Sequence, residues 1–263
     1  MLLVIDIGNT HTVMGLFDGE RLAHRWRVAT DIRKTADEYS LLLCSLISRA
    51  GLSNTDVRGV GICSVVPPLS DVFMQAEKNL FGVSAMLVGP GVKTGMPILY
   101  ENPAEVGSDR IANALAAYQE ARGPVIIVDL GTATTFCAVS KKGEYLGGSI
   151  VPGVGISADA LFARTAKLPR VEIKKPAAVI GRTTVSSIQS GLFFGHLCVV
   201  EGMISRITSE LQQERAHCGI KTRPRVFATG GLAELFGEET DLIDIVDPYL
   251  TLKGIRIIYD KNT

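Results

Sequence analysis

Two short segments carry the same pattern of residues, which suits the binding of phosphate and cations. In each, an aspartate at the end of an apolar run precedes a glycine and small polar residues: Asp6-Ile7-Gly8-Asn9-Thr10 and Asp129-Leu130-Gly131-Thr132-Ala133. The glycines permit a tight turn whose successive N–H groups can surround an anion. The aspartates can hold a cation beside that anion, directly or through water. An isolated copy equally fits an ordinary turn, but two copies in one chain favour a phosphate site.

The elements that must position these segments are also repeated. Residues 2–7 and 124–130 predict strands, and each is followed by a predicted β-hairpin, at 13–28 and 136–150. In the aligned copies Thr12 falls on Thr135 and Val13 on Phe136. We therefore expect an α/β fold of two similar half-domains, residues 1–116 and 117–263, with a nucleotide cleft between them.

The remaining pattern alternates between helices and strands. Thr35 and Glu38 have the spacing of a capping box and predict the start of a helix that Gly51 ends. Pro67-Pro68 is expected to stop a buried strand at 57–65. Further helices are predicted at 69–81, 109–121, 155–166, 183–212 and 249–260, further strands at 84–88 and 225–231, and an irregular loop at 89–106.

Composition excludes several classes of protein. The 263 residues hold 27 Lys and Arg against 27 Asp and Glu, and 46 % of them are apolar. This balance excludes a disordered chain and argues against nucleic-acid binding through bulk charge. The N-terminal segment lacks the basic region of a signal peptide, and no apolar run approaches the roughly 20 residues of a membrane span. Five cysteines without a C-x-x-C pair argue against a disulfide framework or zinc site and predict a cytoplasmic protein.

Four motifs together resemble a known family. They are DIGNTHTV at 6–13, GSDR at 107–110, DLGTATTF at 129–136 and GRTTVSSIQSG at 181–191. In this order and spacing the chain resembles the type III pantothenate kinases, some of which have been called Bvg accessory factors. The resemblance implies the duplicated actin-like fold of the actin, Hsp70 and sugar-kinase superfamily, with mixed sheets flanked by helices. Gly230-Gly231 resembles the glycines on the adenosine side of that fold, although a plain strand-to-helix turn explains the pair equally well.

The same resemblance implies the activity and the residues that serve it. The reaction would be ATP-dependent phosphorylation of the primary hydroxyl of pantothenate, the first step of coenzyme A synthesis, with Asp109 as general base. Asp129 would bind K⁺ or NH₄⁺, Mg²⁺ would arrive with ATP near Asp6, and the enzyme would be a homodimer. The family's ATP-binding residues fall on Asp6, Ile7, Gly8, Asn9, Thr10, His11, Thr12, Val13 and Thr132, and its pantothenate-binding residues on Tyr100, Gly107, Ser108, Asp109, Arg110 and Thr184.

Several of the pantothenate-site residues also have a purely structural interpretation. Asp109 or Ser108 equally suits a helix N-cap, and Arg110 a solvated position in a first helical turn. Tyr100 can anchor its loop, and Thr184 can cap the following helix or serve the site of the partner subunit. Two further motifs are rejected. GPGVKTG at 89–95 lacks the glycine that precedes the Walker A lysine, and GVGISA at 153–158 does not open a βαβ unit.

Two other functions remain open on sequence grounds. One is another small-molecule kinase or ATPase of the same fold, and the other is a nucleotide-binding regulator without catalysis. The presence of Asp6, Asp109 and Asp129 together favours an enzyme, because phosphoryl transfer needs charge neutralisation and a proton acceptor.

Overall fold

The computed structural model describes residues 1–216 and 223–263, and these form two compact units. The first comprises Met1–Gly95, Glu101–Ala116 and Leu250–Thr263, and the second Met96–Tyr100 and Ala117–Tyr249. The predicted division at 116/117 coincides with one boundary of these units. The prediction placed residues 250–263 in the second half, whereas in the structure they belong to the first unit, because helix α7 (Leu250–Asp260) packs against strands of the first sheet.

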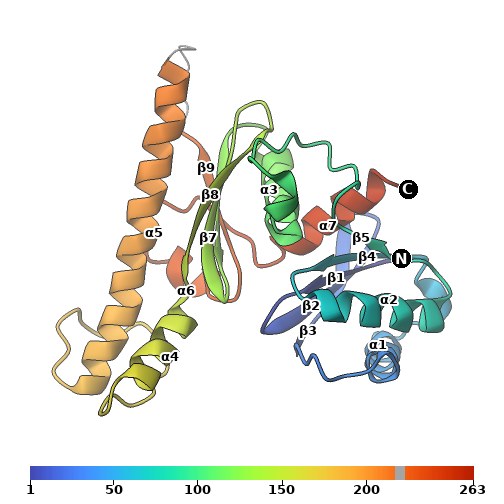
Figure 1. The fold of residues 1–263 in the computed structure, drawn as a ribbon, viewed down its shortest axis with the longest axis horizontal. Coiled ribbons are helices and arrows are strands. Elements are labelled where there is room, and N and C mark those ends of the chain that lie inside the picture. Colours follow the sequence, from blue (N-terminus) through green and yellow to red (C-terminus); the bar gives the residue numbers. More distant parts are fainter. Residues whose placement is uncertain (217–222) are drawn as a thin grey trace. The chain divides into compact units, whose positions relative to one another are not determined.

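The first unit is built on a five-stranded sheet with the order β3-β2-β1-β4-β5. Antiparallel pairing joins β1 to β2 and β2 to β3, and parallel pairing joins β1 to β4 and β4 to β5. The strands are β1 (Leu2–Ile7), β2 (His11–Asp18), β3 (Arg21–Ala29), β4 (Gly59–Ser64) and β5 (Met86–Leu87). Helices α1 (Ala36–Arg49) and α2 (Pro67–Phe81) pack together and share one apolar core with this sheet (Figure 1).

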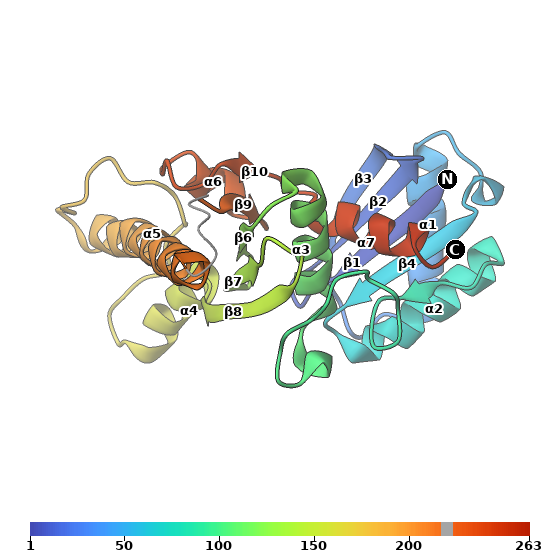
Figure 2. The same cartoon turned by 90° about the horizontal axis from the view of Figure 1, so that it is seen from above.

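Helix α7 covers the opposite face of the first sheet (Figure 2). Two glycines of β4 allow this close approach. A Cβ at Gly59 would clash with the Tyr259 ring, and one at Gly61 would lie 3.0 Å from Ile255 Cγ2. Short 3₁₀ turns at Asn54–Asp56 and Pro103–Glu105 precede β4 and helix α3 (Ser108–Ala121) respectively.

The second unit repeats the first, strand for strand. Its sheet has the order β10-β9-β6-β7-β8, and each pair has the same relative direction as its counterpart in the first sheet. The strands are β6 (Val125–Leu130), β7 (Ala133–Val139), β8 (Tyr145–Pro152), β9 (Arg225–Thr229) and β10 (Ile245–Val246). The predicted duplicated fold is confirmed. The short β10 and helix α6 (Ala233–Gly237) were not predicted, because elements of this length carry no measurable periodicity.

The alignment of the two copies differs from the predicted one by one residue. Asp6 pairs with Val13 across the first hairpin, whereas Asp129 pairs with Thr135 across the second. The turn of the second hairpin is one residue shorter, so Thr12 corresponds in space to Thr134 rather than to Thr135. Since neighbouring residues of a strand point to opposite faces, the shift decides which threonine is buried. Thr12 is 0 % exposed and Thr134 is 1 % exposed.

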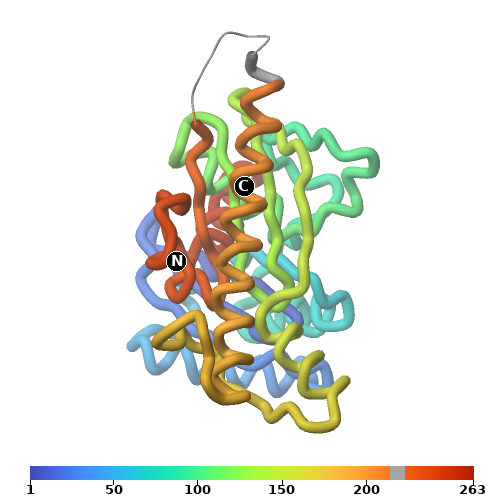
Figure 3. The backbone as a smooth tube through the Cα atoms, turned by 90° about the vertical axis from the view of Figure 1, so that its left-hand side faces the viewer, coloured from blue at the N-terminus to red at the C-terminus, as the bar shows by residue number. Residues whose placement is uncertain are grey.

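The long helix α5 (Thr184–Ala216) lies along the sheet of the second unit (Figure 3). Phe193, Leu197, Val200 and Ile204 of this helix enter the same apolar core as β6, β7 and β9. Among the described residues, Thr184–Gln213 is long and apolar enough to cross a membrane by length and composition. A core helix passes the same test. In α5 the side chains that enter the core account for only part of the apolar character, because 33 % of the 18-residue window is buried. Helix α4 (Val154–Arg164) contacts α5 and β7.

Local signals set most helix ends as expected. The capping box of α1 is present, with the Glu38 N–H donating to Thr35 Oγ1 and the Thr35 N–H donating to Glu38 Oε2. Pro67 and Pro68 lie in the first turn of α2, where a missing N–H is tolerated.

Helix α2 also carries Glu77, whose two carboxyl oxygens are buried without a hydrogen-bond partner. Burial raises the pKa of Glu77 well above its ordinary range, which favours the uncharged form of this side chain in the core.

Candidate active site

The first Asp-x-Gly loop lies between β1 and β2. Gly8 N–H donates to the carbonyl of His11 at 3.1 Å, which closes the turn. Asn9 and Thr10 at its tip are exposed, and Asp6 at the end of β1 is partly buried. Ile7, another of the predicted ATP-binding residues, has a buried side chain, so only its backbone groups can contact a ligand.

Thr30, which sequence reasoning missed, holds this loop in place. Its hydroxyl donates to the carbonyl of Gly8 at 2.7 Å and its N–H donates to the carbonyl of Thr10 at 3.0 Å. The buried hydroxyl of Thr12 lies 2.9 Å from that of Thr30, so the Thr12 side chain stabilises the loop through its contact with Thr30. The predicted hairpin at 13–28 could have pointed to Thr30. When its two strands pair, the residue that follows β3 lies beside the loop that precedes β2.

His11 contacts Arg27 of β3, with Arg27 Nη2 2.9 Å from His11 Nδ1. A guanidinium group can only donate, so Nδ1 accepts and the neutral ring carries its proton on Nε2. Burial and the positive charge of Arg27 both lower the pKa of His11. The segment after the first Asp-x-Gly loop therefore contains a neutral imidazole that presents an N–H donor at its other nitrogen.

Helix α3 begins at the G-x-D-R motif. Ser108 is its first residue, and the Ser108 hydroxyl bonds to Cys63 and to the carbonyl of Ser64 rather than capping the helix. Asp109 Oδ1 accepts the N–H of Arg110 at 2.8 Å. Because the helix begins at Ser108, neither residue is the N-cap itself, but the Asp109 carboxylate does satisfy one N–H of the first turn. Arg110 is only 8 % exposed, so its interpretation as a solvated residue is wrong.

The Asp109 carboxylate occupies a partly buried position. Burial raises the pKa of Asp109, whereas the hydrogen bond from the Arg110 N–H and the positive charge of Arg110 lower it. A Cβ at Gly107 would clash with Asp109 Oδ1, so the glycine of the motif leaves room for the carboxylate. A raised pKa makes Asp109 a stronger proton acceptor than an exposed aspartate.

The second Asp-x-Gly loop lies between β6 and β7. Gly131 N–H donates to the carbonyl of Ala133 at 3.1 Å, and Thr132 at the tip is exposed. Asp129 at the end of β6 faces two glycines. A Cβ at Gly230 would lie 2.5 Å from Asp129 Oδ1, and one at Gly131 would lie 3.4 Å from it. Gly230 also has a φ of +93°, so this tight turn beside the carboxylate favours glycine.

Tyr100 is placed by contacts within the second unit. Leu99 N–H donates to the carbonyl of Tyr145, and Tyr145 N–H donates to the carbonyl of Pro97, both at 2.8 Å. The Tyr100 ring lies against Gly147, where an added Cβ would be 3.5 Å from the ring. The backbone bonds of Pro97 and Leu99, rather than any bond of Tyr100 itself, hold this part of the loop beside β8.

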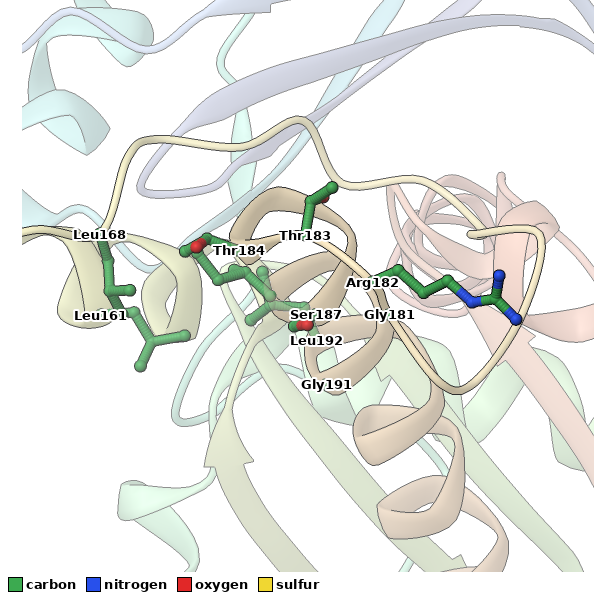
Figure 4. A pocket seen from close by; sticks show the side chains of 10 residues that line it. Leu161, Leu168, Gly181, Arg182, Thr183, Thr184, Ser187, Gly191 and Leu192 are labelled. Atoms are coloured by element: carbon green, nitrogen blue, oxygen red, sulfur yellow. The ribbon is translucent and has the colours of Figure 1, made fainter.

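Thr184 lies on the wall of a pocket of about 800 Å³ at the start of α5 (Figure 4). The helix is capped by its neighbour, because Thr183 Oγ1 accepts the N–H of Ser186 at 3.1 Å. The capping interpretation of Thr184 is therefore wrong, and its hydroxyl is left on the exposed pocket wall. The pocket is lined by Leu161, Leu168, Gly181, Arg182, Thr183, Thr184, Ser187, Ile188, Gly191 and Leu192.

Each unit thus gathers part of the predicted site. The first brings together the loop at 6–13 and the G-x-D-R motif, and the second holds Asp129, Thr132, Tyr100 and Thr184. In the part of the chain that the structure describes, no group of three or more His, Cys, Asp or Glu side chains is placed to hold a metal ion. His217 and Cys218 lie outside the described residues.

Two sheets of identical topology, each with an Asp-x-Gly hairpin loop at the same place, define an actin-like fold of the kind found in sugar kinases. A solved structure from Porphyromonas gingivalis, named as an N-acetylglucosamine kinase, superposes with a TM-score of 0.50 at 12 % identity over 100 % of both chains. A Campylobacter jejuni structure named for the Baf family of transcriptional activators gives 0.62 at 19 % identity, covering 99 % of this chain and 98 % of that one. At these identities the likeness shows the fold.

Sequence comparison defines the family within this class. The family model for type III pantothenate kinase matches residues 2–206. A type III pantothenate kinase from Brevibacillus brevis is 52 % identical over 262 residues, which cover 100 % of this chain and 99 % of the relative. The chain belongs to the type III pantothenate kinase family, and the resemblance seen in its four motifs is confirmed.

Proposed function

We propose that this protein transfers the γ-phosphoryl group of ATP to the primary hydroxyl of pantothenate, giving 4′-phosphopantothenate for coenzyme A synthesis. The observation that carries the proposal is the placement of Asp109. Its partly buried carboxylate lies in the first turn of α3, in a chain that belongs to this kinase family.

Asp109 accepts the proton of the attacking hydroxyl as the new oxygen–phosphorus bond forms and ADP leaves. Its raised pKa supports this role, because a stronger base accepts a proton more readily. Arg110 neutralises negative charge close to the reacting oxygen. Tyr100, Gly107, Ser108 and Thr184 complete the pantothenate site.

The loops at 6–13 and 129–136 bind the phosphates of ATP through their backbone N–H groups and through the exposed Asn9, Thr10 and Thr132. Asp6 would hold the Mg²⁺ that accompanies ATP, and that ion would neutralise phosphate charge. Asp129 would hold K⁺ or NH₄⁺. A carboxylate oxygen suits such a hard cation, and the two glycines facing Asp129 keep other side chains from covering it.

The proposal is tested by incubating the purified protein with ATP, Mg²⁺, K⁺ and pantothenate and identifying the product by mass spectrometry. We expect ADP and a singly phosphorylated pantothenate in equal amounts. ADP release that does not depend on pantothenate, or turnover only with another hydroxyl compound, would replace this function with that of another ATPase or kinase of the same fold.

Replacing K⁺ by Na⁺ is expected to lower turnover about tenfold or more. Asp129 would bind Na⁺ less well than K⁺, so less positive charge would offset the triphosphate. The coupled assay is run at constant ionic strength with K⁺, NH₄⁺ or Na⁺ chloride. In an Asp129→Asn variant the difference between K⁺ and Na⁺ should largely disappear. Equal rates in all three salts for the unsubstituted protein would contradict the role of Asp129 as a cation ligand.

We also propose that the protein is a homodimer that associates through α4, the loop after it and the start of α5. Several large apolar side chains are exposed there, which is unusual for a free surface. They are Ile156 at 45 %, Leu161 at 39 %, Phe162 at 40 %, Ile180 at 82 % and Val185 at 44 % exposure. Leu161 also lines the pocket of Thr184, so a partner at this surface would lie beside that residue.

Sedimentation velocity tests the dimer. We expect twice the 28.2 kDa of one chain for the unsubstituted protein and a monomer for Ile180→Asp, because a buried carboxylate at an apolar interface is unfavourable. Ile32, exposed to 67 % in the first unit, provides the control Ile32→Asp. Dimers that persist in Ile180→Asp would place the interface elsewhere.

The protein is also proposed to be cytoplasmic. The free cysteines 44, 63, 137 and 198 support a location in the reducing cytoplasm.

A further inference from the structure

Cys63 is a fully buried thiol at the junction of β4 and α3, and the mechanism above does not use it. It is the residue of β4 that pairs with Asp6 of β1, and it is 0 % exposed. Its Sγ lies 3.0 Å from Ser108 Oγ, and Ser108 Oγ lies 3.4 Å from the carbonyl oxygen of Ser64. The thiol therefore links the end of β4 to the first residue of α3.

The direction of these hydrogen bonds follows from the groups involved. A backbone carbonyl can only accept, so the Ser108 hydroxyl directs its proton to Ser64 and accepts the S–H of Cys63. The bond to Ser64 is long, and the contact with Cys63 is the closer of the two. Cys63 must then remain a protonated thiol. Burial raises its pKa well above the ordinary range, and the charges of Asp6 and Asp109 raise it further, although the bond to Ser108 opposes them.

The residue that follows Ser108 is Asp109, so the link acts next to the proposed base. Asp109 has little freedom of its own, because its Oδ1 accepts the Arg110 N–H and occupies the space that a Cβ on residue 107 would fill. A movement of the first turn of α3 therefore carries the carboxylate with it. The second unit has a buried polar residue at the equivalent position of its strand β9. In the second unit Thr229 pairs with Asp129 as Cys63 pairs with Asp6, and Thr229 is also buried, at 1 % exposure.

We propose that Cys63 is a positioning residue, which holds the first turn of α3 through Ser108 and so sets the Asp109 carboxylate for proton acceptance. The proposal rests on the proposed function of Asp109. It assigns no covalent chemistry to the thiol, which is buried and protonated.

Cys63→Ala removes the donor, and Cys63→Ser retains one. We expect Cys63→Ala to lower kcat about tenfold with little change in the KM for ATP, because a small displacement of a catalytic group is costly. Cys63→Ser should stay within about threefold of the unsubstituted enzyme. Cys44→Ala is the matched control, since Cys44 lies on α1 of the same unit and is only partly buried. An equal loss of kcat in folded Cys63→Ala and Cys63→Ser would overturn the hydrogen-bonding role.

A second readout does not require turnover. The carboxyl ¹³C signal of Asp109, identified by its absence in Asp109→Asn, is titrated in both Cys63 variants. We expect a lower Asp109 pKa in Cys63→Ala, because the space left by the sulfur admits water, and an unchanged pKa in Cys63→Ser. If pantothenate is not phosphorylated at all, the proposed function fails while this titration still tests the contact. The proposal would be overturned if the Asp109 pKa and the kcat of Cys63→Ala both equalled those of the unsubstituted protein. If Cys63→Ala does not fold, a loss of kcat in folded Cys63→Ser would overturn it instead.

Discussion

Asp109→Asn is expected to lower kcat by at least about 10²-fold while leaving the fold and ATP binding intact. The amide cannot take up the proton of the attacking hydroxyl, and general base catalysis contributes on the order of 10²- to 10⁴-fold. The fold should tolerate the change, because burial already disfavours the charged carboxylate and an amide oxygen can still accept the Arg110 N–H. The measurements are single-turnover rates with pantothenate and the shift of the unfolding temperature on adding ATP.

Asp37→Asn is the matched control for this variant. Asp37 is the second residue of α1, as Asp109 is of α3, and it is exposed. Both substitutions remove the same favourable interaction with a helix N-terminus, worth a few tenths of a kcal/mol to about 1 kcal/mol. Only Asp109→Asn should affect turnover. Near-normal turnover in Asp109→Asn would remove Asp109 from the role of base.

The pH dependence of the unsubstituted enzyme tests the same assignment. Because Asp109 acts as the carboxylate, kcat/KM should fall as the pH is lowered through the pKa of this residue. Burial raises that pKa, so the fall should begin at a higher pH than for an exposed aspartate. The unfolded chain loses this proton at lower pH than the folded chain, so stability decreases slightly as the pH rises through that range. The expected loss of activity in acid is therefore not a loss of folding caused by this residue.

Gly153→Ala is expected to lower turnover about 10²-fold by displacing the second Asp-x-Gly loop, at residues 129–136. A Cβ at Gly153 would clash with the carbonyl oxygen of Thr132 and lie 2.7 Å from that of Gly131. Backbone atoms cannot rotate out of the way, so the loop itself must move, and a displacement of about 1 Å is enough for such a loss. The cause is steric, because the φ of −68° and ψ of 163° at Gly153 are open to alanine.

Gly155→Ala provides the control two residues further along. A Cβ there meets nothing within 4 Å, and position 155 lies within α4, where alanine is favoured over glycine by up to about 1 kcal/mol. We expect this variant to keep its activity and to unfold at a slightly higher temperature. The KM for ATP and the turnover number are measured for both variants. Unchanged values for Gly153→Ala would mean that the loop at 129–136 does not need its present position to bind ATP.

Much of the fold was predictable because it depends on local signals. The capping pair Thr35 and Glu38 specifies the start of α1, and the apolar run after Arg225 specifies β9, each within a few residues. The duplication was visible for the same reason, since both Asp-x-Gly loops retain their short motif. The alignment of Thr12 with Thr135 was wrong, because a turn shortened by one residue leaves almost no trace in the sequence but reverses which face each side chain occupies.

The sequence by itself determined the local elements, the two loops and, through the G-x-D-R motif, the residue proposed as the base. Only the tertiary structure decided which residues support them. Thr30 reaches the first loop across a hairpin, Cys63 meets Ser108 across 45 residues of chain, and α7 joins the sheet of the first unit from the other end of the chain. The physical reason is common to all three. Local conformation follows from neighbouring residues, whereas these contacts depend on how distant elements pack, and no short-range pattern records that packing.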